Sequence, residues 1–136
     1  MKKIILLSTL LSILISCSPG GDDTNYTFEL RPIMSVAIPT EFTLGQTYPI
    51  TIRYNKRTTC NYFSTLYYEK NLNIRTIAIE NAVAQRNNCE DLPNDVSVYT
   101  FNFEVTSNGS YIFKFYQGKN ANGEPIFLEY EIPVTN

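Results

Sequence analysis

Apolar and polar residues alternate along a segment of this chain that runs from residue 48 to residue 54. Its apolar members are Tyr48, Ile50, Ile52 and Tyr54, each separated from the next by one residue. Successive side chains of a β-strand point to opposite faces, so this period of two predicts a strand with one face in a core. An amphipathic helix would instead place its apolar residues three and four positions apart. The segment is therefore expected to be a half-buried β-strand.

The same period recurs through most of the chain after residue 25. It is found over residues 26–38, 99–105, 111–115 and 126–134. Residues 60–70 are rich in aromatic side chains and residues 75–83 in β-branched ones, so both are expected to be strands too, and polar or glycine-containing turns separate these segments. Pro32 interrupts the first of these segments, which favours a place at a sheet edge because proline cannot donate to a strand ladder. Residues 81–86 fit a helical turn as well as a strand, and both alternatives stay open. About seven strands without a long helix predict an all-β fold, an antiparallel β-sandwich or barrel.

The start of the chain is typical of an export signal. Lys2 and Lys3 precede an apolar run over residues 4–15, and Ser16 and Cys17 follow it. A charged start, a short apolar segment and a small residue at its end predict a secretory signal peptide. The run is shorter than the roughly 20 apolar residues that a membrane-spanning helix needs.

The end of that run, Leu14-Ile15-Ser16-Cys17, resembles the bacterial lipobox. The resemblance implies that residues 1–16 are removed and that a lipid on Cys17 anchors the protein to a membrane of the cell envelope, expected to be the outer membrane. Two or more acyl chains, which such proteins usually carry, hold a protein stably. An ordinary signal peptide with an incidental cysteine is the alternative.

Residues 18–25 contain only small and polar side chains. This composition predicts a flexible tether over residues 17–25 and a single domain over residues 26–136. The small and acidic residues after the cysteine also resemble the tethers of lipoproteins exported to the cell surface in the Bacteroidetes group. A generic linker explains them equally well, so whether the domain faces the periplasm or the cell surface stays open.

The chain has three cysteines, and lipid attachment would use Cys17. Exported proteins mature in a compartment that permits disulfides, so Cys60 and Cys89 are expected to form one bridge. A loop of about 30 residues closed in this way would add roughly 3–4 kcal/mol of stability. Two free cysteines in the core are the alternative, and two ligands are too few for a zinc site.

No catalytic constellation, cofactor site or metal site is predicted. The chain has no histidine, which is the commonest general base and metal ligand. Glu129 and Glu131 share a strand face that is expected to be exposed, and Glu90, Asp91 and Asp95 are expected in an acidic turn. Thirteen acidic residues stand against eleven basic ones, without a basic run. This charge pattern argues against a nucleic-acid partner.

Residues 107–113, Ser-Asn-Gly-Ser-Tyr-Ile-Phe, resemble the tyrosine corner of immunoglobulin-like domains. Gly109 and Tyr111 match the motif, and Phe113 replaces its cysteine, so the inter-sheet disulfide of antibody domains cannot form. The resemblance implies an immunoglobulin-like β-sandwich in which the Tyr111 hydroxyl bonds back to the backbone and the chain crosses between two sheets. A tight hairpin at Asn108-Gly109, which would keep both strands in one sheet, is the alternative.

Three further stretches, taken together with the anchor, resemble small Bacteroidetes-type lipoproteins that have one immunoglobulin-like domain. They are residues 75–79, 109–115 and 131–134. The resemblance implies a fold and a location, but it transfers no functional residue to this chain.

Two pairs of aromatic residues form the candidate binding surface. They are Tyr62, Phe63, Tyr67 and Tyr68. Consecutive strand residues point to opposite faces, so one ring of each pair is expected to point outward. An exposed tyrosine can stack on a sugar or anchor a protein partner. Packing in the core on one face and over a sheet edge on the other is the alternative.

The function expected from these features is non-enzymatic binding of a protein or a glycan by a lipid-anchored module. The second expectation is a structural or accessory subunit of an envelope assembly, whose sign would be an exposed apolar edge strand within residues 26–38. A small envelope enzyme is the third, and a pocket lined by Glu90, Asp91 or Asp95 with a perturbed carboxylate would support it.

Overall fold

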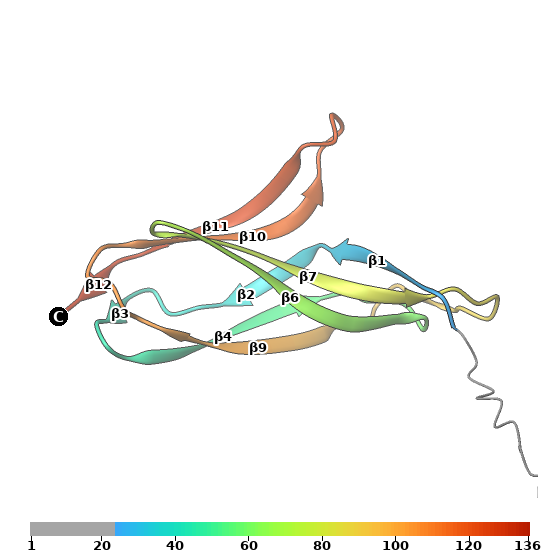
Figure 1. The fold of residues 1–136 in the computed structure, drawn as a ribbon, viewed down its shortest axis with the longest axis horizontal. Coiled ribbons are helices and arrows are strands. Elements are labelled where there is room, and N and C mark those ends of the chain that lie inside the picture. The colour runs from blue at the N-terminus through green and yellow to red at the C-terminus, as the bar shows by residue number, and fades with distance from the viewer. Residues whose placement is uncertain (1–23) are drawn as a thin grey trace, which may run out of the picture.

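The structure is a computed structural model that describes residues 24–136. The predicted signal peptide, Cys17 and all but the last two residues of the predicted tether lie outside the described residues. The described chain is all-β, as expected, and forms no helix (Figure 1). Its strands are β1 (Tyr26–Arg31), β2 (Ile33–Ala37), β3 (Phe42–Thr43), β4 (Thr47–Tyr54), β5 (Arg57–Thr58), β6 (Asn61–Asn71), β7 (Ile74–Ala84), β8 (Asp91–Leu92), β9 (Ser97–Glu104), β10 (Tyr111–Lys119), β11 (Pro125–Ile132) and β12 (Val134–Thr135). Residues 81–84 belong to β7, so the helical alternative for this stretch is wrong.

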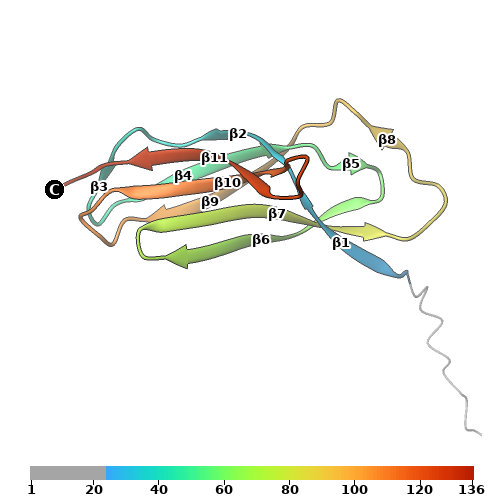
Figure 2. The ribbon, with the colours of Figure 1, turned by 90° about the horizontal axis from the view of Figure 1, so that it is seen from above.

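Two sheets form the layers of the molecule (Figure 2). The larger sheet contains β6, β7, β10, β11 and β1, and the smaller one has the order β2-β4-β9. In the larger sheet, β6 lies along one edge of β7, and two strands share the other edge. β10 pairs with β7 from Ile74 to Ile77, and β1 pairs with it from Ile79 to Ala84. The short pairs β3–β12 and β5–β8 stand apart from these layers.

The sheets are mixed rather than purely antiparallel. β10 runs parallel to β7, and β12 runs parallel to β3, whereas the remaining pairs are antiparallel. The sandwich prediction therefore needs correction in its strand directions and in its count, because the described residues contain twelve strands instead of about seven. Alternation along a strand indicates which side chains are buried, but it contains no information on which strand lies beside which.

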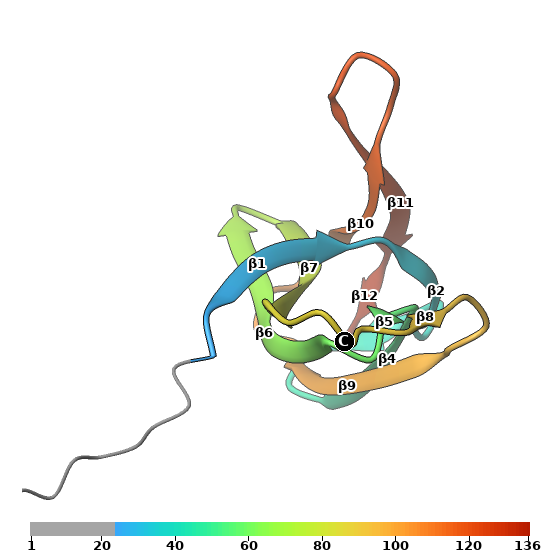
Figure 3. The same ribbon diagram turned by 90° about the vertical axis from the view of Figure 1, so that its right-hand side faces the viewer.

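Pro32 divides the first predicted strand between the two sheets. β1 pairs with β7 in the larger sheet, and β2 pairs with β4 in the smaller sheet. Proline lacks the backbone N–H that a ladder needs, so pairing ends on one side of it and resumes with another partner on the other side. Both pieces lie at sheet edges, and the N-terminal part of the domain thereby connects the two layers (Figure 3).

The core lies between the sheets and is built from the inward residues that the alternation predicts. Its buried members include Ile50 and Ile52 of β4, Ile77 and Ile79 of β7, and Phe113 and Phe115 of β10. Aromatic rings meet edge to face in its centre: Phe103 lies 4.9 Å from Tyr111 and 5.0 Å from Phe113, measured between ring centroids. Each such side chain contributes about 1.5–3 kcal/mol when fully buried.

The connection between β9 and β10 crosses from the smaller sheet to the larger sheet. The Tyr111 hydroxyl accepts hydrogen bonds from the backbone N–H groups of Thr106 and Ser107, at 3.2 and 2.9 Å. The hydroxyl thus satisfies two donors of the connecting loop while its ring stays in the core. A single-sheet hairpin at Asn108-Gly109 is not formed.

The ends of β10 and β11 leave the body as a hairpin, here named the arm, which comprises residues 116–127 (Figure 3). The pairing of β10 with β7 stops at Phe115, because β1 occupies the edge of β7 from Ile79 onward. The register of β10 against β11 shifts between Tyr116 and Gly118, and Gly118 has a φ of 114°. Such a bulge bends the strand, and glycine adopts this φ without steric cost.

Residues 24–136 contain no helix that is long and apolar enough to cross a membrane.

Candidate binding surface

The four aromatic residues predicted as a binding surface divide between the two faces of β6. Phe63 and Tyr68 face the smaller sheet, where Phe63 stacks on Tyr99 of β9 with ring centroids 4.6 Å apart. Tyr68 meets Phe101 of β9 edge to face at 6.3 Å. These two rings close one side of the sandwich, whereas Tyr62 and Tyr67 lie on the outer face of the larger sheet, the face turned away from the smaller sheet.

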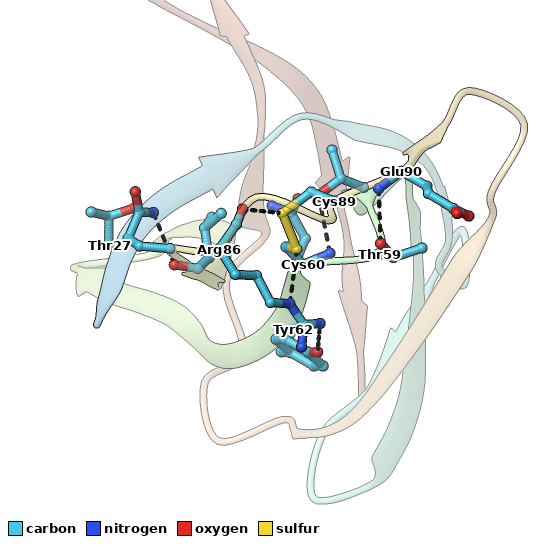
Figure 4. The surroundings of a disulfide bond; sticks show 11 residues. Thr27, Thr59, Cys60, Tyr62, Arg86, Cys89 and Glu90 are labelled. Atoms are coloured by element: carbon cyan, nitrogen blue, oxygen red, sulfur yellow. Dashed lines mark hydrogen bonds between the residues drawn. A yellow bond between two sulfur atoms is a disulfide. The ribbon is translucent and has the colours of Figure 1, made fainter. Parts of the chain in front are cut away.

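The hydroxyl of Tyr62 is engaged with the neighbouring loop. It accepts a hydrogen bond of 2.6 Å from Nη2 of Arg86, whose guanidinium carbon lies 5.9 Å from the centroid of the Tyr62 ring. Arg86 also donates from Nε to Sγ of Cys60 at 3.2 Å (Figure 4). Tyr62 therefore orders the surroundings of the disulfide. All four rings remain 42–45% exposed, and Tyr67 is the one on the outer face whose ring makes no contact with an aromatic ring or a cation among the described residues.

The predicted disulfide joins Cys60 to Cys89, with 5.3 Å between their Cα atoms (Figure 4). Cys60 is buried at the start of β6, and Cys89 lies in the loop that follows β7. The backbone N–H of Thr59 donates to the carbonyl of Glu90, and the N–H of Glu90 donates to the Thr59 hydroxyl. The bridge and these bonds fix the acidic turn to the end of the molecule where residue 24 emerges.

The arm and the outer face of the larger sheet enclose a groove of about 390 Å³, here named the corner groove. Leu30, Tyr67 and Ala78 line the sheet side. Tyr116, Pro125 and Phe127 line the arm side, and the Tyr116 and Phe127 rings meet edge to face at 6.3 Å. The groove thus contains mostly aromatic and aliphatic surface, which is the character of sites that bind apolar groups.

Two charged residues, Glu69 and Lys119, line the corner groove, and the Lys114–Glu129 ion pair lies beside it next to Phe127. The Tyr67 hydroxyl donates a 2.6 Å hydrogen bond to Oε2 of Glu69, and this bond to a carboxylate raises the pKa of Tyr67 above 10.0. Nζ of Lys114 lies 3.0 Å from Oε1 of Glu129 and 5.7 Å from the centroid of the Phe127 ring. An apolar floor with polar groups around it can bury an apolar side chain and orient the chain that carries it.

β1 continues the apolar surface beyond the groove. Its outer-face residues Tyr26 and Phe28 are 51% and 63% exposed, which is unusual for aromatic rings on a paired strand. The N–H of Gln85 donates to the carbonyl of Asn25 at 2.8 Å, so Asn25 and every second residue after it direct their backbone groups to β7. The N–H and C=O groups of Tyr26 and Phe28 consequently point to the other edge, where residues 24–136 supply no strand partner.

The predicted acidic residues are not gathered into one site. Glu129 is paired with Lys114 on the outer face, and Asp95 accepts a hydrogen bond from the Ser97 hydroxyl at 2.8 Å. Asp91 is part of β8 and pairs with Thr58. Among the described residues, no group of three or more histidine, cysteine, aspartate or glutamate side chains could hold a metal ion.

No protein-family model, no curated protein and no solved structure matches this chain.

Proposed function

We propose that this protein is a lipid-anchored component of the cell envelope that binds a protein partner and catalyses no reaction. The anchor rests on the likeness of residues 14–17 to a lipobox and would place the protein in the outer membrane through Cys17. The binding role rests on one observation: the free edge of β1 lies beside exposed aromatic side chains and the apolar corner groove.

The chemistry of this surface favours an extended peptide strand as the partner. A strand laid along β1 would satisfy the N–H and C=O groups of Tyr26 and Phe28, as in other cases of strand addition. Its side chains would alternate, and those on the outer face would lie beside Phe28 and Leu30 and reach the corner groove. We therefore expect a partner segment with apolar residues at every second position.

We also propose that the sandwich is immunoglobulin-like. The two hydrogen bonds to the Tyr111 hydroxyl and the crossing from β9 to β10 support this assignment. The parallel pairing of β7 with β10 departs from the antiparallel sheets of that class. We therefore assign β4, β9, β10 and β11 to the immunoglobulin-like part of the sandwich. The β6–β7 pair differs from that class because β7 runs parallel to β10.

A structural or accessory subunit of an envelope assembly is the second candidate function. The observation that favours it is the same exposed apolar edge strand, because such an edge is an aggregation hazard unless another chain covers it. A permanent subunit would keep β1 covered at a fixed stoichiometry, whereas a binding module would exchange its partner.

Photocrosslinking tests the binding surface. A photoreactive residue in place of Phe28 should form an adduct in the native envelope, and the same residue in place of Val98 should not. Val98 is the matched control, because it is 58% exposed on β9 of the other sheet. A protease-resistant adduct would indicate a glycan and overturn the peptide partner. A constant partner ratio in purified complexes would identify a subunit.

A binding measurement completes the test. A synthetic copy of the crosslinked peptide should bind the full purified chain, and Phe28→Glu should weaken this binding about tenfold or more. Val98→Glu should leave it unchanged, and equal losses in both variants would overturn the proposed surface. The anchor is tested separately by the mass of the peptide that contains Cys17, because Cys17→Ser should abolish any lipid mass and release the protein from the membrane fraction.

A further inference from the structure

Arg75 is a buried cation at the end of the sandwich that lies farthest from residue 24. Arg75 is the second residue of β7, on the same strand face as the buried Ile77 and Ile79, and it is only 4% exposed. β7 begins at the turn that joins it to β6 (Figure 2). The guanidinium carbon lies 5.0 Å from the centroid of the Tyr111 ring and 6.0 Å from that of Phe103. The rings stabilise the charge in part, because their faces carry negative electrostatic potential.

The hydrogen bonds of Arg75 use one of its three nitrogens. Nη1 donates to the carbonyls of Leu72 and Ile74 at 2.8 and 2.9 Å. Within residues 24–136, Nε and Nη2 donate no hydrogen bond to a backbone carbonyl or a carboxylate, and no carboxylate lies within 4.0 Å of the guanidinium; the Tyr68 hydroxyl is the side-chain group that interacts with it. A buried charge without a counter-charge is unfavourable, so the unused side of the guanidinium is suited to an anion.

Lys70 brings a second positive charge to the same place. It lies directly opposite Arg75 in the β6–β7 ladder, so both side chains leave the same face of the sheet. Like charges at directly opposed positions of an antiparallel pair destabilise it. The ion pairs found in the described part of the chain involve neither residue. Two unpaired cations on one face thus favour an anion between them.

A cavity of about 250 Å³ opens at these two residues, between β6 and β9. Besides Arg75 and Lys70, its lining includes Tyr68, Asn102, Glu104 and Thr106. Burial raises the pKa of Tyr68, against smaller opposing effects of the charge of Arg75 and of a hydrogen bond with it, so the hydroxyl stays protonated and its proton can be donated to an anion. Glu104 adds one negative charge at the lining, which disfavours a doubly charged anion relative to a singly charged one.

We propose that this cavity binds a carboxylate, with the Nε–Nη2 side of Arg75 as its bidentate partner and Lys70 as the second cation. Arginine presents a planar fork that matches the two oxygens of a carboxylate, whereas lysine contributes a point charge. The carboxylate could belong to a small free acid or to the C-terminus of a peptide. The turn between β6 and β7, beside which the cavity opens, and the first described residues lie at opposite ends of the long axis (Figure 1). This site is separate from the corner groove.

The Nε–Hε signal of Arg75 in ¹⁵N–¹H NMR spectra reports directly on this site. The natural protein, with whatever processing the cell carries out, is purified and titrated with sodium acetate. A separate titration uses sodium chloride at the same ionic strength. We expect acetate to shift the Arg75 signal with saturation and chloride to produce no saturating shift. Acetate that behaves like chloride, or sulfate that binds more tightly than acetate, would overturn the carboxylate site.

Variants and peptides then identify the second cation and the source of the carboxylate. Lys70→Met should weaken acetate binding about fivefold, the loss of roughly 1 kcal/mol from one partly exposed charge. Lys119→Met on the arm is the matched control and should leave the affinity for acetate unchanged. Equal acetate affinities in the two variants would contradict the site. A short peptide that binds more tightly than acetate, and loses binding when its C-terminus is amidated, would identify a peptide terminus. Equal affinities for acetate and the free peptide would identify a small acid.

Discussion

The hydroxyl of Tyr111 lies 2.9 Å from the backbone nitrogen of Ser107, four residues earlier in the chain. The same hydroxyl accepts the N–H of Thr106, so one side-chain oxygen satisfies two backbone donors where the chain crosses between the sheets. The ring of Tyr111 packs on Phe103 and beneath the guanidinium of Arg75. One residue therefore contacts the connecting loop, the core and the buried cation Arg75.

Tyr111→Phe should lower the free energy of unfolding by about 1–2 kcal/mol, because it leaves two N–H groups without their acceptor while the ring stays in place. Chemical denaturation measures the loss. Tyr130→Phe is the matched control, because the Tyr130 hydroxyl makes no hydrogen bond within residues 24–136, and it should change stability by much less. Equal losses in the two variants would show that the corner does not depend on this hydroxyl.

Replacement of both Cys60 and Cys89 by serine should lower the free energy of unfolding by about 3–4 kcal/mol, because the bridge closes a loop with a sequence separation of 29 residues. The comparison of denaturation curves for oxidised and reduced wild-type protein provides an independent measurement. The double variant should not respond to reductant. A wild-type protein equally stable in both redox states would contradict the contribution assigned to the bridge.

Asn81→Leu should stabilise the protein. Asn81 is fully buried on the inner face of β7, and neither its Nδ2 nor its Oδ1 has a hydrogen-bond partner among the described residues. Burial of unsatisfied polar atoms costs about 1–3 kcal/mol, and leucine has the same number of side-chain heavy atoms and the same branching at Cγ without polar atoms to satisfy. Thermal unfolding checks the direction. A lower melting temperature would mean that an internal water satisfies the amide.

Gly118→Ala should destabilise the arm by about 1–2 kcal/mol, because residue 118 has a φ of 114°. The effect comes from the backbone alone, since the nearest atom to an added Cβ would be Cγ of Pro32 at an ordinary 3.7 Å. Gly109→Ala is the matched control: an added Cβ there meets nothing within 4 Å, and its φ lies outside the positive range. Hydrogen exchange of the arm amides should accelerate in the first variant only.

Stability should fall as the pH rises above about 10, the ordinary tyrosine value. The pKa values of Tyr54 and Tyr68 are raised mainly by burial, and that of Tyr67 mainly by its hydrogen bond to Glu69. A group with a raised pKa in the folded state contributes stability that is present below its unfolded pKa and is lost as the pH passes the folded one. Denaturation at pH 8 and pH 11, with tyrosinate absorbance as the readout, checks the direction.

Alternation in the sequence predicted the all-β class, the buried faces of β4, β7 and β10, and the break at Pro32. The cysteine count predicted the bridge between Cys60 and Cys89. These features depend on local residue patterns or on the number of cysteines, and both can be read from a single sequence. Pairing order is different, because it depends on contacts between distant segments, and no local pattern places β7 between β6 and β10.

The candidate sites were harder to predict for the same reason. Tyr116 directly follows the inward Phe115, and Phe127 lies between Ile126 and Leu128, so both fall on the strand face that the alternation predicts to point outward, and nothing in the sequence indicates that they meet in a groove. Arg75 is in phase with Ile77 and Ile79, which are expected to point inward, and that register was the available signal for a buried cation. Of the four predicted aromatic residues, Tyr67 lines the corner groove, and Phe63 and Tyr68 pack against β9.

The place where the chain enters the domain determines how it would respond to mechanical force. Residue 24 lies at one end of the long axis, and β1 pairs with β7 over six opposed positions (Figure 1). A force applied to the preceding residues along that axis would act parallel to β1. It would therefore load all six pairs of β1 and β7 in shear at the same time, instead of breaking their hydrogen bonds one after another. Past Pro32 the same load reaches β2 and the smaller sheet. A domain held in this way should resist extension while a ligand at its far end is under tension.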